Sequence, residues 1–67
     1  MNITVFNEKE QETNQVNFTG NTVKELLNYL NINPETVLVV REGEVITEEE
    51  SLHEDDFIEL LSVISGG

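Results

Sequence analysis

The sequence contains no cysteine and only three basic residues against fourteen acidic ones, for a formal charge of −11 over 67 residues. Without cysteine, neither a disulfide nor a thiolate zinc site can hold the chain together. A chain of this length forms one domain, and its stability must come from one small core. Because strong negative charge repels nucleic-acid phosphates and anionic lipids, we expect no nucleic-acid partner, no membrane, and a protein partner with a basic surface.

Long hydrophobic runs are also missing. No stretch approaches the ~18 apolar residues of a membrane-spanning helix. The N-terminal MNITVF lacks the basic region and apolar stretch of a signal peptide. We therefore expect a soluble, cytoplasmic protein. We also expect it to act as a monomer.

The motifs of enzymes and metal sites are absent as well. No G-x-G-x-x-G or G-x-x-x-x-G-K surrounds Gly20, so no phosphate-binding loop is predicted. The only histidine, His53, has Ser51 and Asp56 nearby, but all three lie on one predicted loop without a scaffold to fix their roles. The acidic run over 48–56 does not fit the EF-hand pattern. We predict no catalytic residue, no metal site and no bound cofactor; a hydrolase built around His53 is the remotest alternative.

What the sequence does contain begins with two stretches that alternate apolar and polar residues, with the apolar positions at Ile3, Val5, Val16 and Phe18. Alternation with a period of two predicts strands over 2–7 and 14–19. The stretch between them, NEKEQETN, is polar and charged, and it reads as the loop of a hairpin.

A helix is predicted next, because four apolar residues follow with the spacing i, i+3, i+4 and i+7: Val23, Leu26, Leu27 and Leu30. Thr22 and Glu25 match a capping box at its start. Pro34 disfavours helical geometry at the residue before it, which predicts an end near Asn31 and a length of about ten residues. A helix this short must pack its apolar face on something.

Three further strands are predicted, over 36–42, 44–46 and 57–65. The first, TVLVVRE, lacks alternation, which is typical of a strand that is central or covered on both sides. One helix over one mixed sheet buries both apolar faces, so the fold class is α+β, with a four- to five-stranded sheet. This order is that of the β-grasp, or ubiquitin-like, fold, with the first and last strands parallel and adjacent at its centre. A ferredoxin-like sandwich would need a second helix, for which only the acidic run is available.

The last two residues, Gly66 and Gly67, form a pair without side chains. Glycine loses more backbone freedom on ordering than any other residue, so we expect a domain over 1–65 and a flexible tail over 66–67. A tail without Cβ atoms can enter a narrow channel of an enzyme and present its α-carboxylate there. Attack of that carboxylate on the α-phosphate of ATP would produce an acyl-adenylate.

Three stretches together resemble the ThiS/MoaD sulfur-carrier proteins and the small archaeal ubiquitin-like modifiers: GNTVKELLNYLNI, LVVREGEVI and the closing EDDFIELLSVISGG. The chain's compactness is closer to ThiS than to MoaD, although Ser65 replaces the alanine usual before the two glycines. The resemblance implies a role in cofactor biosynthesis or tRNA thiolation. It implies that Gly67, preceded by Gly66, is adenylated by an E1-like adenylyltransferase that uses ATP and magnesium, and becomes a thiocarboxylate. A sulfur donor system and a downstream sulfur-accepting synthase would complete the partners.

The same resemblance implies an apolar docking patch on the sheet face opposite the helix. If Ile58 and Leu60 face the helix, alternation places Phe57 and Leu61 on the other face, together with Phe6 of the first strand. Two alternatives stay open. The chain could be a modifier joined to lysines through Gly67, or a β-grasp interaction domain whose terminal glycines are incidental.

Overall fold

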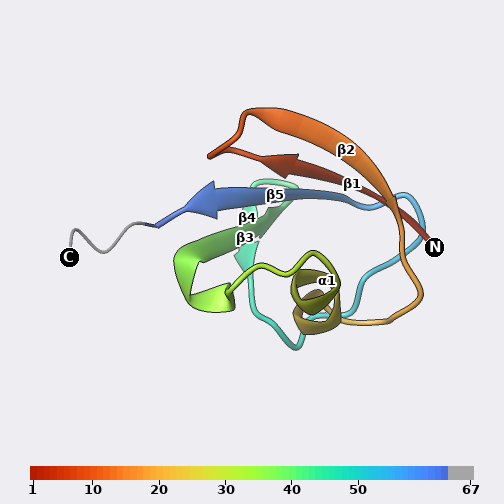
Figure 1. Cartoon of the computed structure of the whole chain (residues 1–67). Coiled ribbons are helices and arrows are strands. Elements are labelled where there is room, and N and C mark those ends of the chain that lie inside the picture. Colours follow the sequence, from red (N-terminus) through yellow and green to blue (C-terminus); the bar gives the residue numbers. More distant parts are fainter. Residues whose placement is uncertain (64–67) are drawn as a thin grey trace.

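The computed structural model describes residues 1–63, in which a five-stranded sheet packs against one α-helix (Figure 1). The elements are β1 (Asn2–Asn7), β2 (Glu12–Asn17), α1 (Val23–Tyr29), the 3₁₀ helix η1 (Pro34–Thr36), β3 (Val37–Arg41), β4 (Glu44–Ile46) and β5 (Phe57–Ser62). The strand order is β2-β1-β5-β3-β4, in which β1 and β5 are parallel and the other neighbours antiparallel. The predicted β-grasp fold, with its first and last strands paired in the sheet interior, is confirmed.

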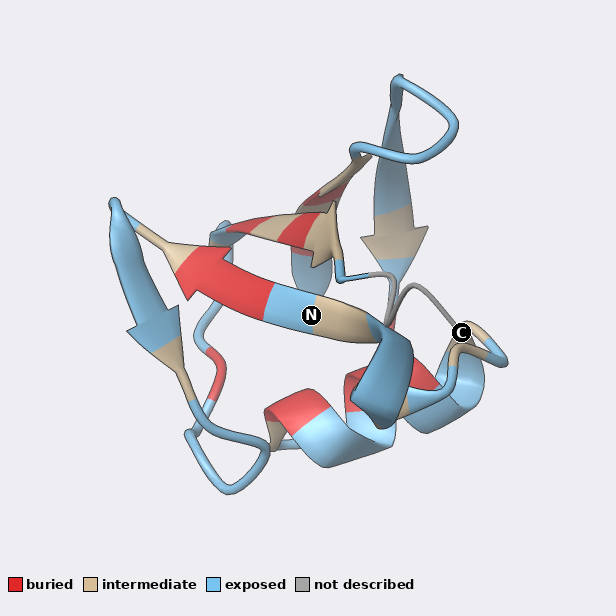
Figure 2. Cartoon of the chain, turned by 90° about the vertical axis from the view of Figure 1, so that its left-hand side faces the viewer, coloured by how far each residue is buried: buried red, intermediate tan, exposed pale blue. Residues whose placement is uncertain are grey.

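The core lies between α1 and one face of the sheet, where Figure 2 shows the buried segments of strands and helix turned toward each other. It consists of Ile3, Val5, Phe18, Val23, Leu26, Leu27, Val39, Leu52, Ile58 and Leu60. The apolar stripe predicted for the helix is therefore the stripe that is buried. Leu52 was not predicted: it is a lone apolar residue in the acidic run, and it is only 4% exposed.

The predicted capping box is present at the start of α1. The Thr22 hydroxyl accepts a hydrogen bond from the Glu25 N–H at 3.3 Å. The Glu25 carboxylate in turn accepts from the N–H groups of Asn21 and Thr22 at 3.0 and 3.1 Å. These bonds, first from Asn21 and then from the backbone and hydroxyl of Thr22, lower the pKa of Glu25.

The helix ends earlier than predicted, and for a different reason. Asn31 adopts the left-handed conformation with φ of 61° and donates its N–H to Asn28, while the Ile32 N–H reaches the Leu27 carbonyl at 2.9 Å. These two bonds form a Schellman motif, which closes the last turn before the chain reaches Pro34. Pro34 instead begins η1. No helix within residues 1–63 is long and apolar enough to cross a membrane.

The first hairpin also differs from its predicted boundaries. Gln11 has a φ of 52°, and Asn7 pairs directly with Glu12, so β2 begins two residues earlier than the predicted position 14. It likewise ends at Asn17 rather than at position 19. Phe18 continues the pairing beyond the strand, because its N–H donates to the Met1 carbonyl at 2.8 Å. The loop is shorter than predicted because Gln11, although not a glycine, adopts a left-handed conformation in the turn. The charged composition of the loop does not indicate such a conformation.

Candidate docking face and the end of β5

The side of the sheet that faces away from α1 presents apolar residues from its interior strands. Ile58 and Leu60 are fully buried against the helix. Because side chains alternate along a strand, Phe57 and Leu61 of β5 point to the opposite side. Phe57 is 50% exposed and Leu61 is half-buried. Phe6, also half-buried, is on the same side from β1, since its neighbour Val5 lies in the core.

The strand register adds residues that the sequence analysis missed. Leu38 lies opposite Leu61, and Val40 lies opposite both Glu59 of β5 and Val45 of β4. Since paired residues share a face, these three join the predicted ones. We call the set the open face, and it consists of Phe6, Leu38, Val40, Val45, Phe57 and Leu61.

Five of the six residues are half-buried or exposed, which supports a contact surface, whereas Val40 is only 8% exposed. Leu38 is 41% exposed and Val45 is 64% exposed. Scattered exposed apolar residues are ordinary, but a contiguous group on one face is typical of a protein–protein site. The unbroken apolar run of β3 concealed Leu38, because it indicated a strand covered on both sides. β3 is indeed interior in the sheet, but only one of its sides is covered by α1.

The end of β5 is held from both sides. The Ser62 N–H donates to the Glu8 carboxylate at 3.1 Å, and the Val63 N–H donates to the Thr36 carbonyl at 3.0 Å. These bonds fix the course of the chain up to the last described residue. Gly66 and Gly67, the predicted tail and activation site, lie outside the described residues. Glu8 and Thr36 were not predicted, because a bond between segments so distant in the chain leaves no local pattern.

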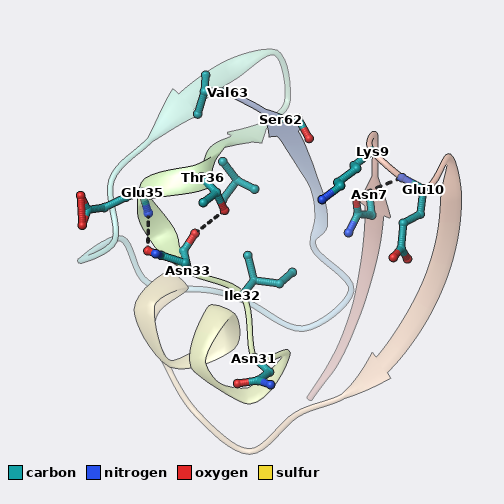
Figure 3. A pocket seen from close by; sticks show the side chains of 11 residues that line it. Asn7, Lys9, Glu10, Asn31, Ile32, Asn33, Glu35, Thr36, Ser62 and Val63 are labelled. Atoms are coloured by element: carbon teal, nitrogen blue, oxygen red, sulfur yellow. Dashed lines mark hydrogen bonds between the residues drawn. The ribbon is translucent and has the colours of Figure 1, made fainter. Parts of the chain in front are cut away.

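A cavity of about 430 Å³ lies beside this end of β5 (Figure 3). Lys9 reaches in from the first hairpin, and Asn33 and Thr36 line the opposite wall. Asn33 accepts hydrogen bonds from the Thr36 hydroxyl at 2.7 Å and from the Glu35 N–H at 2.9 Å. Much of the polar lining of the cavity therefore forms hydrogen bonds within η1 and its N-cap, and we assign the cavity no ligand.

Arg41 of β3 binds the acidic run through a hydrogen bond and two ion pairs. Its guanidinium donates to the Ser51 carbonyl at 2.8 Å and pairs with Glu50 at 3.1 Å and Asp56 at 3.3 Å. The side chain of His53 is 72% exposed, and its Nδ1 is 3.8 Å from the same Asp56 carboxylate. A carboxylate already shared with Arg41 and a solvated imidazole do not make a nucleophile–base pair.

Metal binding gains no support from the acidic run either. Within the part of the chain that the structure describes, no three side chains of the types that ligate metals converge on one point. Glu50 and Asp56 of this run are both paired with the guanidinium of Arg41.

Comparison with known proteins gives two matches. A family model described as the ThiS family matches residues 3–67. The protein described as "Sulfur carrier protein TtuB" from Thermus thermophilus is 46% identical over 57 residues, which is 84% of this chain and 88% of that protein. The family match includes all residues of the open face and continues through Gly67.

Proposed function

The chain belongs to the ThiS family, and we propose that this sulfur carrier acts through the α-carboxylate of Gly67. An E1-like enzyme would adenylate that carboxylate, and a sulfur donor would convert the adenylate to a thiocarboxylate. The single observation that carries the proposal is the match through Gly67 to a family of sulfur carriers. The chain would thus be a carrier and a substrate of the activating enzyme.

The proposed chemistry follows from the poor reactivity of a carboxylate as an acyl donor. Its oxygen attacks the α-phosphate of ATP, and pyrophosphate leaves. Hydrosulfide then attacks the acyl carbon, AMP leaves with the electron pair of the broken acyl–oxygen bond, and loss of the sulfur-bound proton leaves the thiocarboxylate. Magnesium held by the activating enzyme would neutralise phosphate charge during the first step. ATP and magnesium are therefore assigned to the partner.

The described part of the chain supports this division of labour. The open face offers the activating enzyme an apolar surface of five half-buried or exposed residues around the buried Val40. The hydrogen bonds at Ser62 and Val63 fix the end of β5 relative to that face. A docked domain would therefore present its last residues from a defined starting point. Two terminal glycines suit a narrow active-site channel, because neither has a side chain.

Deletion of Gly66 and Gly67 tests the proposal. The assay is ATP–pyrophosphate exchange by the host enzyme fraction whose exchange activity depends on added carrier. We expect the truncated chain to support no exchange, while it melts as the full chain does and competes with it for the enzyme. Ser65→Ala, which keeps both glycines, is the matched control and should retain activity. Exchange supported by the truncated chain would contradict the assignment.

A further inference from the structure

Glu59 lies in the middle of the open face. Along β5 it is flanked at two residues' distance by Phe57 and Leu61. Across the sheet it is paired with Phe6 of β1 on one side and with Val40 of β3 on the other. A half-buried carboxylate is therefore bordered by apolar residues in all four directions.

The described part of the chain places no paired cation beside this carboxylate. Within residues 1–63, Glu59 forms no ion pair, and the ion pairs present involve Arg41 and His53. Arg41 is the only arginine of the chain. It lies opposite Ile58, a core residue, and so on the other side of the sheet. There its guanidinium binds Ser51, Glu50 and Asp56.

This placement has a consequence for docking. A protein that covers Phe6, Phe57 and Leu61 must also remove water from Glu59, which lies between them. A carboxylate that loses water without gaining a partner opposes binding strongly. The apolar neighbours therefore favour docking only if the incoming surface also satisfies the carboxylate.

We propose that the partner inserts a guanidinium or ammonium group opposite Glu59, at the centre of an otherwise apolar contact. The proposal rests on the proposed function, because it takes the activating enzyme as the occupant of the open face. Arginine fits best, since its planar guanidinium can donate two parallel hydrogen bonds to one carboxylate. The pair would select among partners, because an apolar surface without a cation would leave Glu59 buried and unpaired.

A second copy of this chain fits the open face poorly. Two copies each carry a formal charge of −11, so their approach is opposed at long range. A symmetric contact centred on this face would bring two Glu59 carboxylates together, and Arg41 is engaged on the other side of the sheet. Charge complementarity thus favours a different protein with a basic residue.

The test measures the KM of the carrier in carrier-dependent ATP–pyrophosphate exchange, with the enzyme fraction purified from the host. We expect Glu59→Gln and Glu59→Leu each to raise KM at least roughly tenfold, and Glu59→Lys roughly a hundredfold, with kcat little changed. Glu59→Leu discriminates best, because it makes the open face more apolar and would improve binding if the contact were purely apolar. Glu49→Gln and Glu49→Lys remove or reverse the same charge at an exposed residue of the acidic run and should change KM by no more than about twofold.

The outcomes separate this proposal from the function on which it rests. If the unsubstituted chain supports exchange and the KM of Glu59→Leu is equal to or lower than that of the unsubstituted chain, the proposed cation opposite Glu59 is wrong. The sulfur-carrier proposal would then still stand. Glu59 variants that match their Glu49 counterparts would overturn the proposed cation as well. If the unsubstituted chain supports no exchange, the proposed function fails, and this inference fails with it. Melting curves confirm that each variant is folded, with Glu59→Gln as the least disruptive.

Discussion

The carboxylate of Glu8 accepts a hydrogen bond of 3.1 Å from the backbone N–H of Ser62, although the two residues are 54 positions apart. The bond joins the first hairpin to the last residue of β5. On the other side, Val63 is bonded to the Thr36 carbonyl. The end of β5 is therefore fixed by two contacts, from Glu8 and from Thr36, that the sequence analysis did not predict.

Glu8→Ala removes one of these two supports. Loss of a hydrogen bond worth about 1 kcal/mol should make amide exchange at Ser62 about fivefold faster. Glu8→Gln keeps an oxygen acceptor and should restore most of the protection. Glu12→Ala removes the same charge from the same hairpin without touching Ser62, and it serves as the control. Unchanged exchange at Ser62 in Glu8→Ala would show that the bond does not hold β5 in solution.

Leu61→Glu tests the docking role of the open face. Leu61 is half-buried and lies opposite Leu38, so a carboxylate there can stay hydrated in the free protein. We expect the KM of the carrier in the exchange assay to rise roughly tenfold or more, while cooperative melting is retained.

The adjacent Leu60 is the matched contrast. It is fully buried, so Leu60→Ala should destabilise the fold by about 2–5 kcal/mol. The free energy of unfolding, measured by urea titration, distinguishes the two positions. If Leu61→Glu lowered the free energy of unfolding as much as Leu60→Ala is expected to do, Leu61 would be a core residue and its docking assignment would be wrong.

Thr22→Ala should weaken the start of α1. The helix has only seven residues, and the hydroxyl of Thr22 accepts the bond from the Glu25 N–H. Loss of such a cap costs about 1 kcal/mol, which lowers the melting temperature of a domain this small by about 4–8 °C. Thr22→Ser keeps the hydroxyl and should melt close to the unsubstituted chain. If the melting temperature fell equally in both variants, the effect would not come from the loss of the cap.

Glu25 should contribute to the loss of folding stability at acid pH. Its pKa is lowered by the bonds from Asn21 and Thr22, so the folded state favours the charged carboxylate. The contribution is therefore complete above the pKa of the unfolded chain and is lost as pH falls through the folded pKa. Glu25→Gln should be less stable than the unsubstituted chain near neutral pH, and the difference should shrink in acid.

Urea titrations at several pH values measure this difference. Glu49→Gln, which removes one charge at an exposed residue, is measured alongside as the control for net charge. A stability difference for Glu25→Gln that stays constant from neutral to acid pH would contradict the linkage, because it would not depend on the charge of Glu25.

The features predicted correctly from the sequence are those set by local periodicity. Leu26 and Leu27 form the buried stripe of α1, and the alternation of β5 places Ile58 in the core and Phe57 outside it. The capping box was also recognisable, because Thr22 and Glu25 are three residues apart and directly precede the apolar run.

The features that escaped prediction depend on backbone conformation or on distant pairing. Asn31 ends α1 by adopting a left-handed conformation, which its residue type permits but does not require. Leu38 belongs to the open face because of the register between β3 and β5. That register cannot be predicted from the sequence of either strand alone. The roles of Gly66 and Gly67 remain predictions, since both lie outside the described residues.

The most direct test of the central claim is the intact mass of the chain after incubation with Mg-ATP, a sulfur source and extract of the host. The account predicts a shift equal to the exchange of one oxygen for one sulfur, mapped by fragmentation to Gly67. Larger adducts joined through Gly67 would instead indicate a protein modifier. An unchanged Gly67, in an extract shown to activate a known carrier, would contradict the account and favour an interaction domain with incidental terminal glycines.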